Sequence, residues 1–539
     1  MLVWPERSFV PLWDANVYLQ CVVDAGAYGL TVESLRCGGH HAQLYTGLLA
    51  MTQLWQPGNL TALIVANLIL AAGALAAFYA VLRRLIPGEG WWLDRALLVT
   101  ILAVHPLTAA TLVQLNLDFG VCVFFAITLA ALVWDRHRVA ALAGLFLCFS
   151  KETGVLVYAA TITLHLVFRV FAGSGPAFAR CWGAIRRAAP IMLPLAVYVS
   201  FLAWWAVTHD SSVIWIRDTQ ERPLSGMRWF DFDDVVLRSY LAIILVLGFA
   251  WVPALVIATD FARGALRMLR RLEDRSPAGV NVNLAWFLAS LTAVLMYLLT
   301  VYRTWSFPRY FAILAPLLIL TAFVSLVRLG VPPRARRLGL AALGLVLLSA
   351  NWWSWDPVSQ RLFGTVDLGA SGVYDVSSIA RDFRPLGTDH FCYNLQFTAF
   401  HYALNAAFAA VRPGETTTIV FPRFNRWGLW APLDARTFAR VATRTNSFLP
   451  RYADETQIAA MRDSRPHELW LIEQPNDADT LARQALHRAY VDAGLARYTE
   501  RGLSVTVRHL VRRDTRMSTF PPAIPTEPPP PRFTVKRHD

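Results

Sequence analysis

Five short clusters of ionisable and aromatic residues interrupt an otherwise apolar chain, and their residue types suit one kind of chemistry. Arginine and lysine bind phosphate groups, and arginine does so through a bidentate fork. An aspartate among large apolar residues is partly removed from water and is a usable proton acceptor. Such residues predict a base-assisted attack on a substrate that carries a phosphate. The clusters are 11–18 with Asp14, 38–45 with His40 and His41, 114–119 with Asp118, 150–154 with Lys151 and Glu152, and 302–310 with Arg303, Arg309 and Tyr310.

Each cluster also has a structural interpretation. Aspartate is preferred at helix N-termini, and two histidines suit the polar start of an interfacial helix. For Asp14 and for His40 and His41, these interpretations are the favoured ones on spacing alone. The histidines are otherwise candidates to bind an anion or a metal, although no third ligand follows at a metal-like spacing. Lys151 suits a snorkelling side chain, and the residues around Arg309 suit an aromatic belt with arginine anchors.

Charge in the connections between apolar segments predicts that all five clusters share one side of a membrane. Arginine marks every second connection, which is typical of cytoplasmic loops, so the connections that hold the clusters lie outside. Most of the apolar segments reach the roughly 20 residues that a spanning helix needs. We predict ten segments, near 60–82, 96–114, 119–134, 139–150, 153–171, 188–207, 235–259, 284–302, 310–328 and 338–355.

Two of these segments are irregular. Pro106 lies inside the second segment and should bend it, because proline removes a backbone donor. The segment 139–150 is too short to span a membrane alone. It forms either a separate helix that meets the next one at Ser150-Lys151-Glu152 or one bent unit with that helix.

The bulk composition agrees with a membrane protein. Hydrophobic residues make up 55% of the chain and charged residues only 16%, against about 25% charged residues in soluble proteins. The net charge of +13 comes largely from arginine in loops. Anionic lipid headgroups explain this charge better than a nucleic acid does.

We predict four regions along the chain. Residues 1–56 form an outer catalytic loop with amphipathic helices, and 57–355 form the transmembrane domain. Residues 356–517 form a small extracytoplasmic α/β domain, with strands at 416–421, 468–472 and 503–510 and a helix at 478–493. The proline-rich tail, 518–539, should be disordered. No signal peptide precedes the outer loop, so either the first helix inverts or an upstream spanning helix is missing, which we favour.

The six cysteines are scattered and include no CxxC motif, so they do not indicate a zinc site. Cys21 and Cys37 share the outer loop and would be able to pair in an oxidising compartment. Two unrelated buried thiols are the favoured interpretation.

The order of these motifs resembles that of the GT-C membrane glycosyltransferases, in particular the protein O-mannosyltransferase and aminoarabinose-transferase branch. The resemblance covers about residues 11–330, roughly the membrane half, and rests on short motifs in a common order. The motifs are Trp13-Asp14, the stretch from Gly39-His40 to Leu44-Tyr45, His105-Pro106, Leu117-Asp118-Phe119, Ser150-Lys151-Glu152-Thr153-Gly154 and Pro308-Arg309-Tyr310.

The resemblance implies a sugar donor linked to polyprenyl phosphate and an acceptor hydroxyl or amine on a glycan, a lipid or a protein. Asp14 would then be the catalytic base, and direct attack would invert the anomeric carbon. Asp118 would shape the active site or hold a divalent metal where one is used. The donor phosphate would be bound by Lys151, Arg303, Arg309 and Tyr310, with His40, His41 and Glu152 as further site residues.

The sequence therefore predicts an α-helical polytopic membrane protein of about ten to eleven spans with a small C-terminal α/β domain. Its predicted function is glycosyl transfer at the outer face of the inner membrane. One alternative is a transporter or flippase of a lipid-linked sugar, although that class usually carries polar residues through the depth of the bilayer. The other alternative is a non-catalytic membrane scaffold whose outer domain binds a partner.

Overall fold

The computed structural model describes most of the helical part of the chain and separate strands of the C-terminal part. The described residues are 14–37, 40–55, 59–172, 177–208, 251–269, 279–302, 308–351, 365–367, 373–375, 417–421, 451–452, 468–473, 488–500 and 503–513. Predictions for Arg303, for the segment 235–250 and for the tail 518–539 lie outside these residues.

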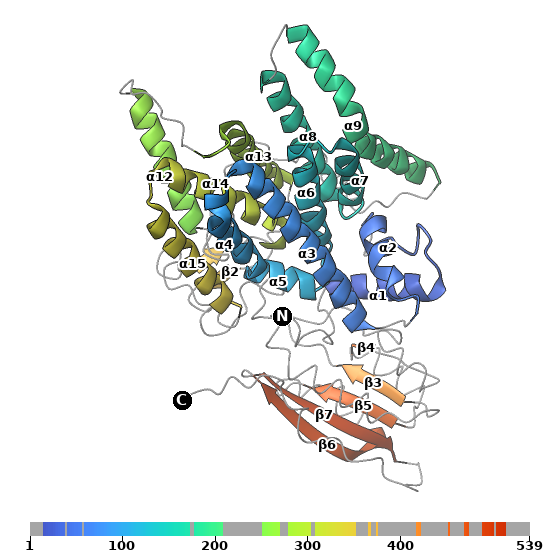
Figure 1. Cartoon of the computed structure of the whole chain (residues 1–539). Coiled ribbons are helices and arrows are strands. Elements are labelled where there is room, and N and C mark those ends of the chain that lie inside the picture. Colours follow the sequence, from blue (N-terminus) through green and yellow to red (C-terminus); the bar gives the residue numbers. More distant parts are fainter. Residues whose placement is uncertain are drawn as a thin grey trace.

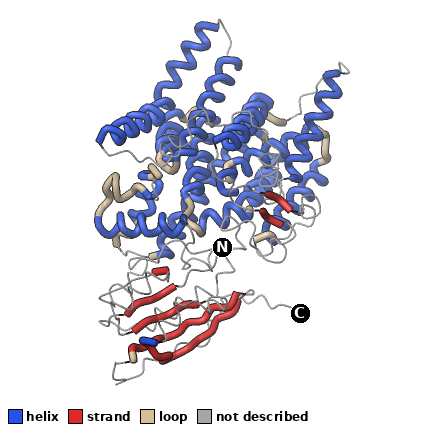
Figure 2. Tube along the Cα trace, turned by 180° about the vertical axis from the view of Figure 1, so that it is seen from behind, coloured by secondary structure: helices blue, strands red, loops and turns tan. Residues whose placement is uncertain are grey.

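The described residues before position 352 are almost entirely helical (Figures 1 and 2). The α-helices are α1 (Asp14–Tyr28), α2 (Gln43–Met51), α3 (Leu60–Leu85), α4 (Trp92–Ala103), α5 (Pro106–Val113), α6 (Leu117–Val133), α7 (His137–Cys148), α8 (Glu152–Ala172), α9 (Ala177–Thr208), α12 (Trp251–Leu269), α13 (Val282–Tyr302), α14 (Leu314–Arg328) and α15 (Pro333–Ser349). Two short 3-10 helices, η3 (Glu89–Trp91) and η6 (Pro308–Phe311), join them.

Several of these helices have the length and composition of membrane spans. Four segments among the described residues are long and apolar enough to cross a bilayer, namely Leu60–Leu85, Glu152–Phe171, Ala189–Thr208 and Val282–Leu299. The bent pair Glu89–Ala103 and Pro106–Val113 adds a fifth if it forms one span, and α6, α7 and α14 are shorter apolar helices. The chain is thus a helical, multi-pass membrane protein, and the count of about ten spans stays a prediction.

Helix ends follow the local sequence. The Asn59 side chain accepts the backbone N–H of Ala62 at the start of α3, and the Asn116 side chain accepts that of Asp118 at the start of α6. Asparagine suits both positions, because it satisfies an N–H group that has no partner inside the helix. Pro106 is the first residue of α5, which turns by 48° from the helical segment before it. The predicted bend at this proline is confirmed.

The junction of α7 and α8 takes the two-helix alternative rather than one bent unit. The helices end and begin at Cys148 and Glu152, so Lys151 lies in the short connection between them. Gly154 makes this junction tight, because a Cβ atom at that position would lie 2.0 Å from the carbonyl oxygen of Leu147. The glycine therefore lets the first turn of α8 press against the last turn of α7.

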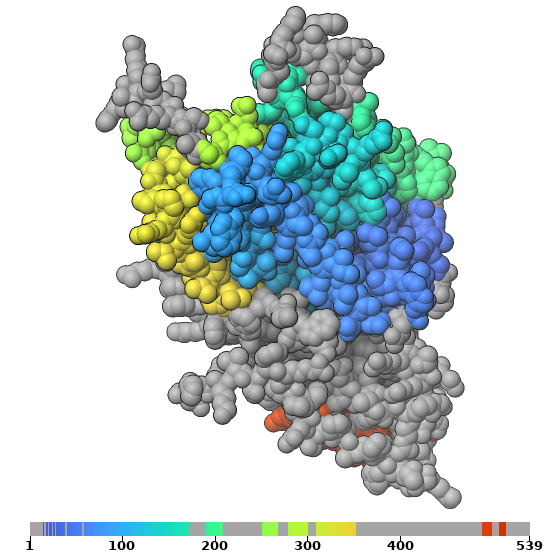
Figure 3. Space-filling model, in the orientation of Figure 1, coloured from blue at the N-terminus to red at the C-terminus, as the bar shows by residue number. Residues whose placement is uncertain are grey.

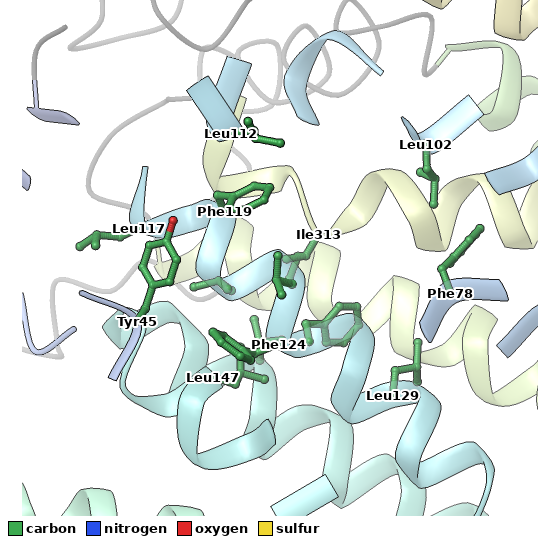
Figure 4. Close-up of a cluster of buried hydrophobic side chains, with 14 of the residues drawn as sticks. Tyr45, Phe78, Leu102, Leu112, Leu117, Phe119, Phe124, Leu129, Leu147 and Ile313 are labelled. Atoms are coloured by element: carbon green, nitrogen blue, oxygen red, sulfur yellow. The ribbon is translucent and has the colours of Figure 1, made fainter. Parts of the chain in front are cut away.

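The core of the helical part centres on α6, which is buried on nearly every side. A helix that is apolar all round, as this one is, must be enclosed by neighbours. Figure 4 shows Phe119 and Phe124 of α6 near Tyr45 of α2 and Leu147 of α7. Gly120 allows this approach, since a Cβ atom there would lie 2.7 Å from the Tyr45 ring.

A buried ion pair joins α4 to α15 at the arginine-rich ends of the helices. Asp94 is fully buried and accepts from Arg336 Nε at 2.8 Å and from Arg337 Nε at 3.0 Å. The space-filling view shows these distant parts of the chain side by side, the first helices in blue and the region of α15 in yellow (Figure 3). This contact connects the fourth helix to the last one.

The C-terminal strands form one five-stranded sheet and one two-stranded sheet. The larger sheet has the order β4-β3-β5-β7-β6 and lies beyond the end of the bundle at which α1 and α5 lie (Figure 1). Its strands are β3 (Thr417–Phe421), β4 (Arg451–Tyr452), β5 (Glu468–Glu473), β6 (Tyr490–Glu500) and β7 (Leu503–Arg512). The neighbours β3 and β4, and β3 and β5, are parallel, whereas β7 is antiparallel to β5 and β6. The small sheet pairs β1 (Thr365–Asp367) with β2 (Val373–Asp375) in antiparallel register.

The three predicted strands are confirmed as β3, β5 and β7. The predicted helix over 478–493 is wrong at its C-terminal end, because residues 490–493 begin β6; residues 478–487 lie outside the described part. Tyr490 to Asp492 pair with Arg512 to Leu510, and this ladder overrides the helical periodicity of the segment.

Candidate functional site

Lys151 and Asp118 form a buried ion pair at the ends of three helices. The Nζ atom of Lys151 donates to both carboxylate oxygens of Asp118, at 3.0 and 2.8 Å. The two side chains are only 6% and 4% exposed. Asp118 is the second residue of α6, whose cap at Asn116 fixes its backbone, and Lys151 is held by the tight α7–α8 junction. Burial by itself lowers the pKa of Lys151, but the Asp118 carboxylate raises it above its ordinary value, so the lysine is protonated.

Arg309 and Tyr310 complete this cluster from η6. The Nε atom of Arg309 lies 3.6 Å from an oxygen of Asp118, and the arginine is 5% exposed. The ring centroid of Tyr310 lies 4.1 Å from Lys151 Nζ and 5.6 Å from the Arg309 guanidinium carbon. Two cations thus share one carboxylate and one aromatic face. We name Asp118, Lys151, Arg309 and Tyr310 the phosphate cluster. With two cations and one carboxylate, the phosphate cluster carries one excess positive charge.

Glu152 belongs to a second pair beside the phosphate cluster. It is the first residue of α8, where a negative charge is favourable at the helix N-terminus. One of its carboxylate oxygens lies 2.9 Å from His40 Nδ1, and the other accepts the backbone N–H of His41 at 3.3 Å. Lys151 and Glu152 therefore have separate partners and do not form an ion pair with each other.

His41 lies in an aromatic setting and is fully buried. Its ring packs edge-on against Phe201 and Trp205 of α9, with ring centroids 5.3 and 5.1 Å apart. The Gln43 amide lies 3.2 Å from its Nδ1 atom. Burial lowers the pKa of His41 from 6.5 to about 4, so the ring is neutral at physiological pH. The sequence offered no signal for the contribution of α9, which lies more than 150 residues away in the chain.

A disulfide bond between Cys21 and Cys37 ties α1 to the loop that carries the histidines. The interpretation of Cys21 and Cys37 as two unrelated thiols is therefore wrong. Spacing alone did not decide the question, because the loop between the cysteines has to fold back before their side chains meet. Within the described residues, Cys122 and Cys148 are free.

Comparisons with known proteins give a similarity of fold. No model of a known protein family matches the chain, and no curated protein matches it. The fold is similar to that of ArnT. Two solved structures of this aminoarabinose transferase from Cupriavidus metallidurans align with the chain. The one bound to undecaprenyl phosphate has 13% sequence identity and a TM-score of 0.48, covering 94% of this chain and 95% of that chain. The one in the apo state has 14% identity and a TM-score of 0.48, covering 92% and 94%.

The structure brings together some of the predicted site residues and leaves others unplaced. Asp118, Lys151, Arg309 and Tyr310 meet in the phosphate cluster, and His40, His41 and Glu152 meet beside it. Asp14 is the first residue of α1, but its side chain lies outside the described part of the structure, as does Arg303. Across the described residues, no group of three or more His, Cys, Asp or Glu side chains is placed to hold a metal ion. A divalent metal at Asp118 stays a prediction.

Proposed function

We propose that this protein is a membrane glycosyltransferase that uses a sugar donor linked to polyprenyl phosphate. The observation that carries the proposal is the phosphate cluster, in which two buried cations surround a single carboxylate at the helix ends. A phosphate diester would satisfy the excess positive charge, since Arg309 and Lys151 both bind phosphate oxygens well. As the bond to the sugar breaks, the same cations stabilise the charge on the leaving phosphate.

The membrane setting supports a lipid-linked donor. The phosphate cluster lies at the ends of the apolar helices α6, α7 and α8, so the phosphate would sit at the level of the headgroups. A polyprenyl chain could then remain among lipid tails while its phosphate enters the cluster. This arrangement needs no passage of the donor through a water-filled channel.

The outer face of the inner membrane is the proposed place of reaction. The Cys21–Cys37 disulfide joins α1 to the loop that carries His40, and His40 contacts Glu152. Disulfides persist in oxidising compartments such as the bacterial periplasm. The arginine-rich connections and the Asp94–Arg336 pair then belong to the cytoplasmic ends, in line with the charge rule for membrane topology.

An inverting displacement also requires a group that accepts the proton of the attacking hydroxyl. Asp14, at the start of α1, is the candidate that the family resemblance implies. His40, which Glu152 holds, is a second candidate among the described residues. The acceptor, which is a glycan, a lipid or a protein, would approach from the side of α1 and of the histidine loop.

Binding of a polyprenyl phosphate tests the proposal directly. We expect the purified protein in detergent to bind undecaprenyl phosphate, detected by native mass spectrometry. Arg309→Gln should weaken binding about 10- to 100-fold, as for the loss of a hydrogen bond to a charged group. Arg83→Gln is the matched control, because Arg83 is exposed in the last turn of α3. Equal binding by both variants would contradict the proposal and favour a scaffold.

Transfer activity separates a transferase from a flippase. Membrane vesicles with the protein should transfer sugar from one of a panel of polyprenyl-phosphate donors carrying mannose, glucose or aminoarabinose. Movement of the donor across liposomes without any transfer would instead support a flippase. The proposal fails if no member of the panel yields a transfer product.

A further inference from the structure

His40 and Glu152 form a pair whose geometry is that of an oriented proton acceptor. Nδ1 of His40 lies 2.9 Å from an oxygen of Glu152. A carboxylate accepts only, so Nδ1 carries the proton and Nε2 keeps a lone pair in the neutral ring. The same logic orients the base in other enzymes that activate a hydroxyl through histidine.

The carboxylate of this pair is itself held from two sides. The backbone N–H of His41 donates to its second oxygen, and the N-terminus of α8 faces it with the positive end of the helix dipole. Glu152 is 10% exposed, whereas His40 is 25% exposed. The buried carboxylate is therefore fixed, and the histidine presents part of its ring to the outside of the cluster.

The pair lies next to the phosphate cluster and faces α1. Glu152 follows Lys151 directly in the chain. The carboxylate that contacts His40 and the ammonium group of the phosphate cluster therefore belong to adjacent residues. The ring of His40 lies 6.1 Å from that of Tyr18. Tyr18 belongs to α1, so His40 packs against that helix.

On the basis of the proposed function, we infer that His40 is the catalytic base and that the acceptor is a hydroxyl group. The acceptor oxygen forms a bond to the anomeric carbon, and the bond from that carbon to the phosphate oxygen breaks. The bonding electron pair leaves with the polyprenyl phosphate, which Lys151 and Arg309 stabilise. The acceptor proton passes to Nε2 of His40, and Glu152 stabilises the imidazolium ion that results.

The neighbouring histidine does not suit this role. His41 is fully buried against Phe201 and Trp205, and burial lowers its pKa to about 4. Its backbone N–H, not its ring, contacts Glu152. His41 thus serves to position the carboxylate, whereas His40 is the partly exposed ring of the two.

The pH dependence of transfer tests the assignment. With the panel donor that is active and octyl glucoside as the hydroxyl acceptor, kcat/KM of the wild type should rise with pH, as it does in reactions that need an unprotonated base. His40→Ala should lower kcat about 10²- to 10⁴-fold and abolish this rise. Added imidazole should restore part of the rate. Binding of undecaprenyl phosphate, which involves the phosphate cluster, should be retained.

Glu152→Gln gives a second and milder variant. The substitution removes the negative charge that stabilises the imidazolium ion formed in the transfer step, so it should reduce the maximum rate. The charged and titratable groups around this pair are Tyr18 on α1, His41 and Arg36 in the same loop, and Lys151 beside Glu152. His137→Gln, at the far end of α7, is the matched control and should keep the wild-type profile.

Several outcomes would overturn the inference. If His40→Ala keeps the wild-type pH profile, or loses activity without any rescue by imidazole, His40 is not the base. If Asp14→Asn alone removes the rise with pH, Asp14 takes this role. Transfer that persists in all these variants leaves the proposed function standing, whereas the absence of transfer from every donor removes the proposed function and this inference together.

Discussion

Lys151 Nζ lies 2.8 Å from Asp118 Oδ2 although the two residues are 33 positions apart in the chain. Both side chains are buried, so each charge depends on the other. The desolvation cost of such a pair is large, and its contribution to stability is small or negative compared with an apolar pair. Such a pair is therefore weak evidence for stability, which agrees with its proposed role in binding a phosphate.

Removal of one member should therefore destabilise the protein strongly. Asp118→Asn leaves Lys151 and Arg309 without their carboxylate, and we expect a loss of about 3–5 kcal/mol in the free energy of unfolding. Asp118→Asn combined with Lys151→Met removes both charges of the pair and should regain much of this loss. Transfer should stay absent in both. Thermal unfolding in detergent, measured beside transfer, would contradict this account if the double variant were the less stable one.

The aromatic face of Tyr310 should matter more than its hydroxyl group. Lys151 Nζ lies 4.1 Å from the ring centroid, a distance at which a desolvated cation–π contact contributes about 2 kcal/mol. Tyr310→Phe keeps this face and should have nearly wild-type binding of undecaprenyl phosphate. Tyr310→Leu should bind it at least tenfold more weakly. Equal losses in the two variants would show that the hydroxyl group, not the ring, is the important part.

The sequence predicted those structural features that depend on the local residues alone. Pro106 bends its segment as expected, because a missing backbone donor acts whatever the surroundings are. The strands near 417 and 468 follow from their apolar, β-branched residues. The arginines in the connections predicted that Asp118, Lys151 and Arg309 share one end of the helices, and the three side chains do meet.

The sequence did not specify which residues on that side touch. Lys151 has Glu152 as its neighbour, but its partner is Asp118, because the packing of α6 against the α7–α8 junction decides the pairing. The Cys21–Cys37 bond depends likewise on how the loop after α1 folds back. Residues 490–493 pair with β7, and their helical pattern carries no information about that partner strand.

The α7–α8 junction should tolerate no side chain at Gly154. An alanine Cβ would lie 2.0 Å from the carbonyl oxygen of Leu147, and a backbone atom cannot move without displacing α7. We expect Gly154→Ala to cost about 1–3 kcal/mol and to reduce transfer, since Lys151 lies three residues before it. Gly73→Ala in α3 is the control, because nothing lies within 4 Å of its Cβ position. Wild-type activity in Gly154→Ala would contradict the tight junction.

The disulfide should stabilise the outer loop. A bond that closes a loop of this size, with a sequence separation of 16 between its ends, contributes about 3 kcal/mol. Cys21→Ser combined with Cys37→Ser should therefore lower the melting temperature in detergent, and a reducing agent should lower that of the wild type alone. Alkylation of the denatured but unreduced protein, read by mass spectrometry, should label Cys122 and Cys148 but not Cys21 and Cys37. Labelling of Cys21 and Cys37 without prior reduction would show that the bond is absent.

Acid should weaken the aromatic packing around His41. Its pKa in the folded protein is about 4, against 6.5 for an exposed histidine, so the unfolded chain binds more protons between these values. The contribution of His41 to stability is thus complete above pH 6.5 and is lost as the pH falls from 6.5 towards 4. We expect the melting temperature of the wild type to fall over this range more steeply than that of His41→Phe, which cannot be protonated. Because Glu152 accepts the backbone N–H of residue 41, that contact survives the substitution. Parallel curves for the two proteins would mean that His41 takes up its proton within the fold and that Phe201 and Trp205 leave room for water beside it.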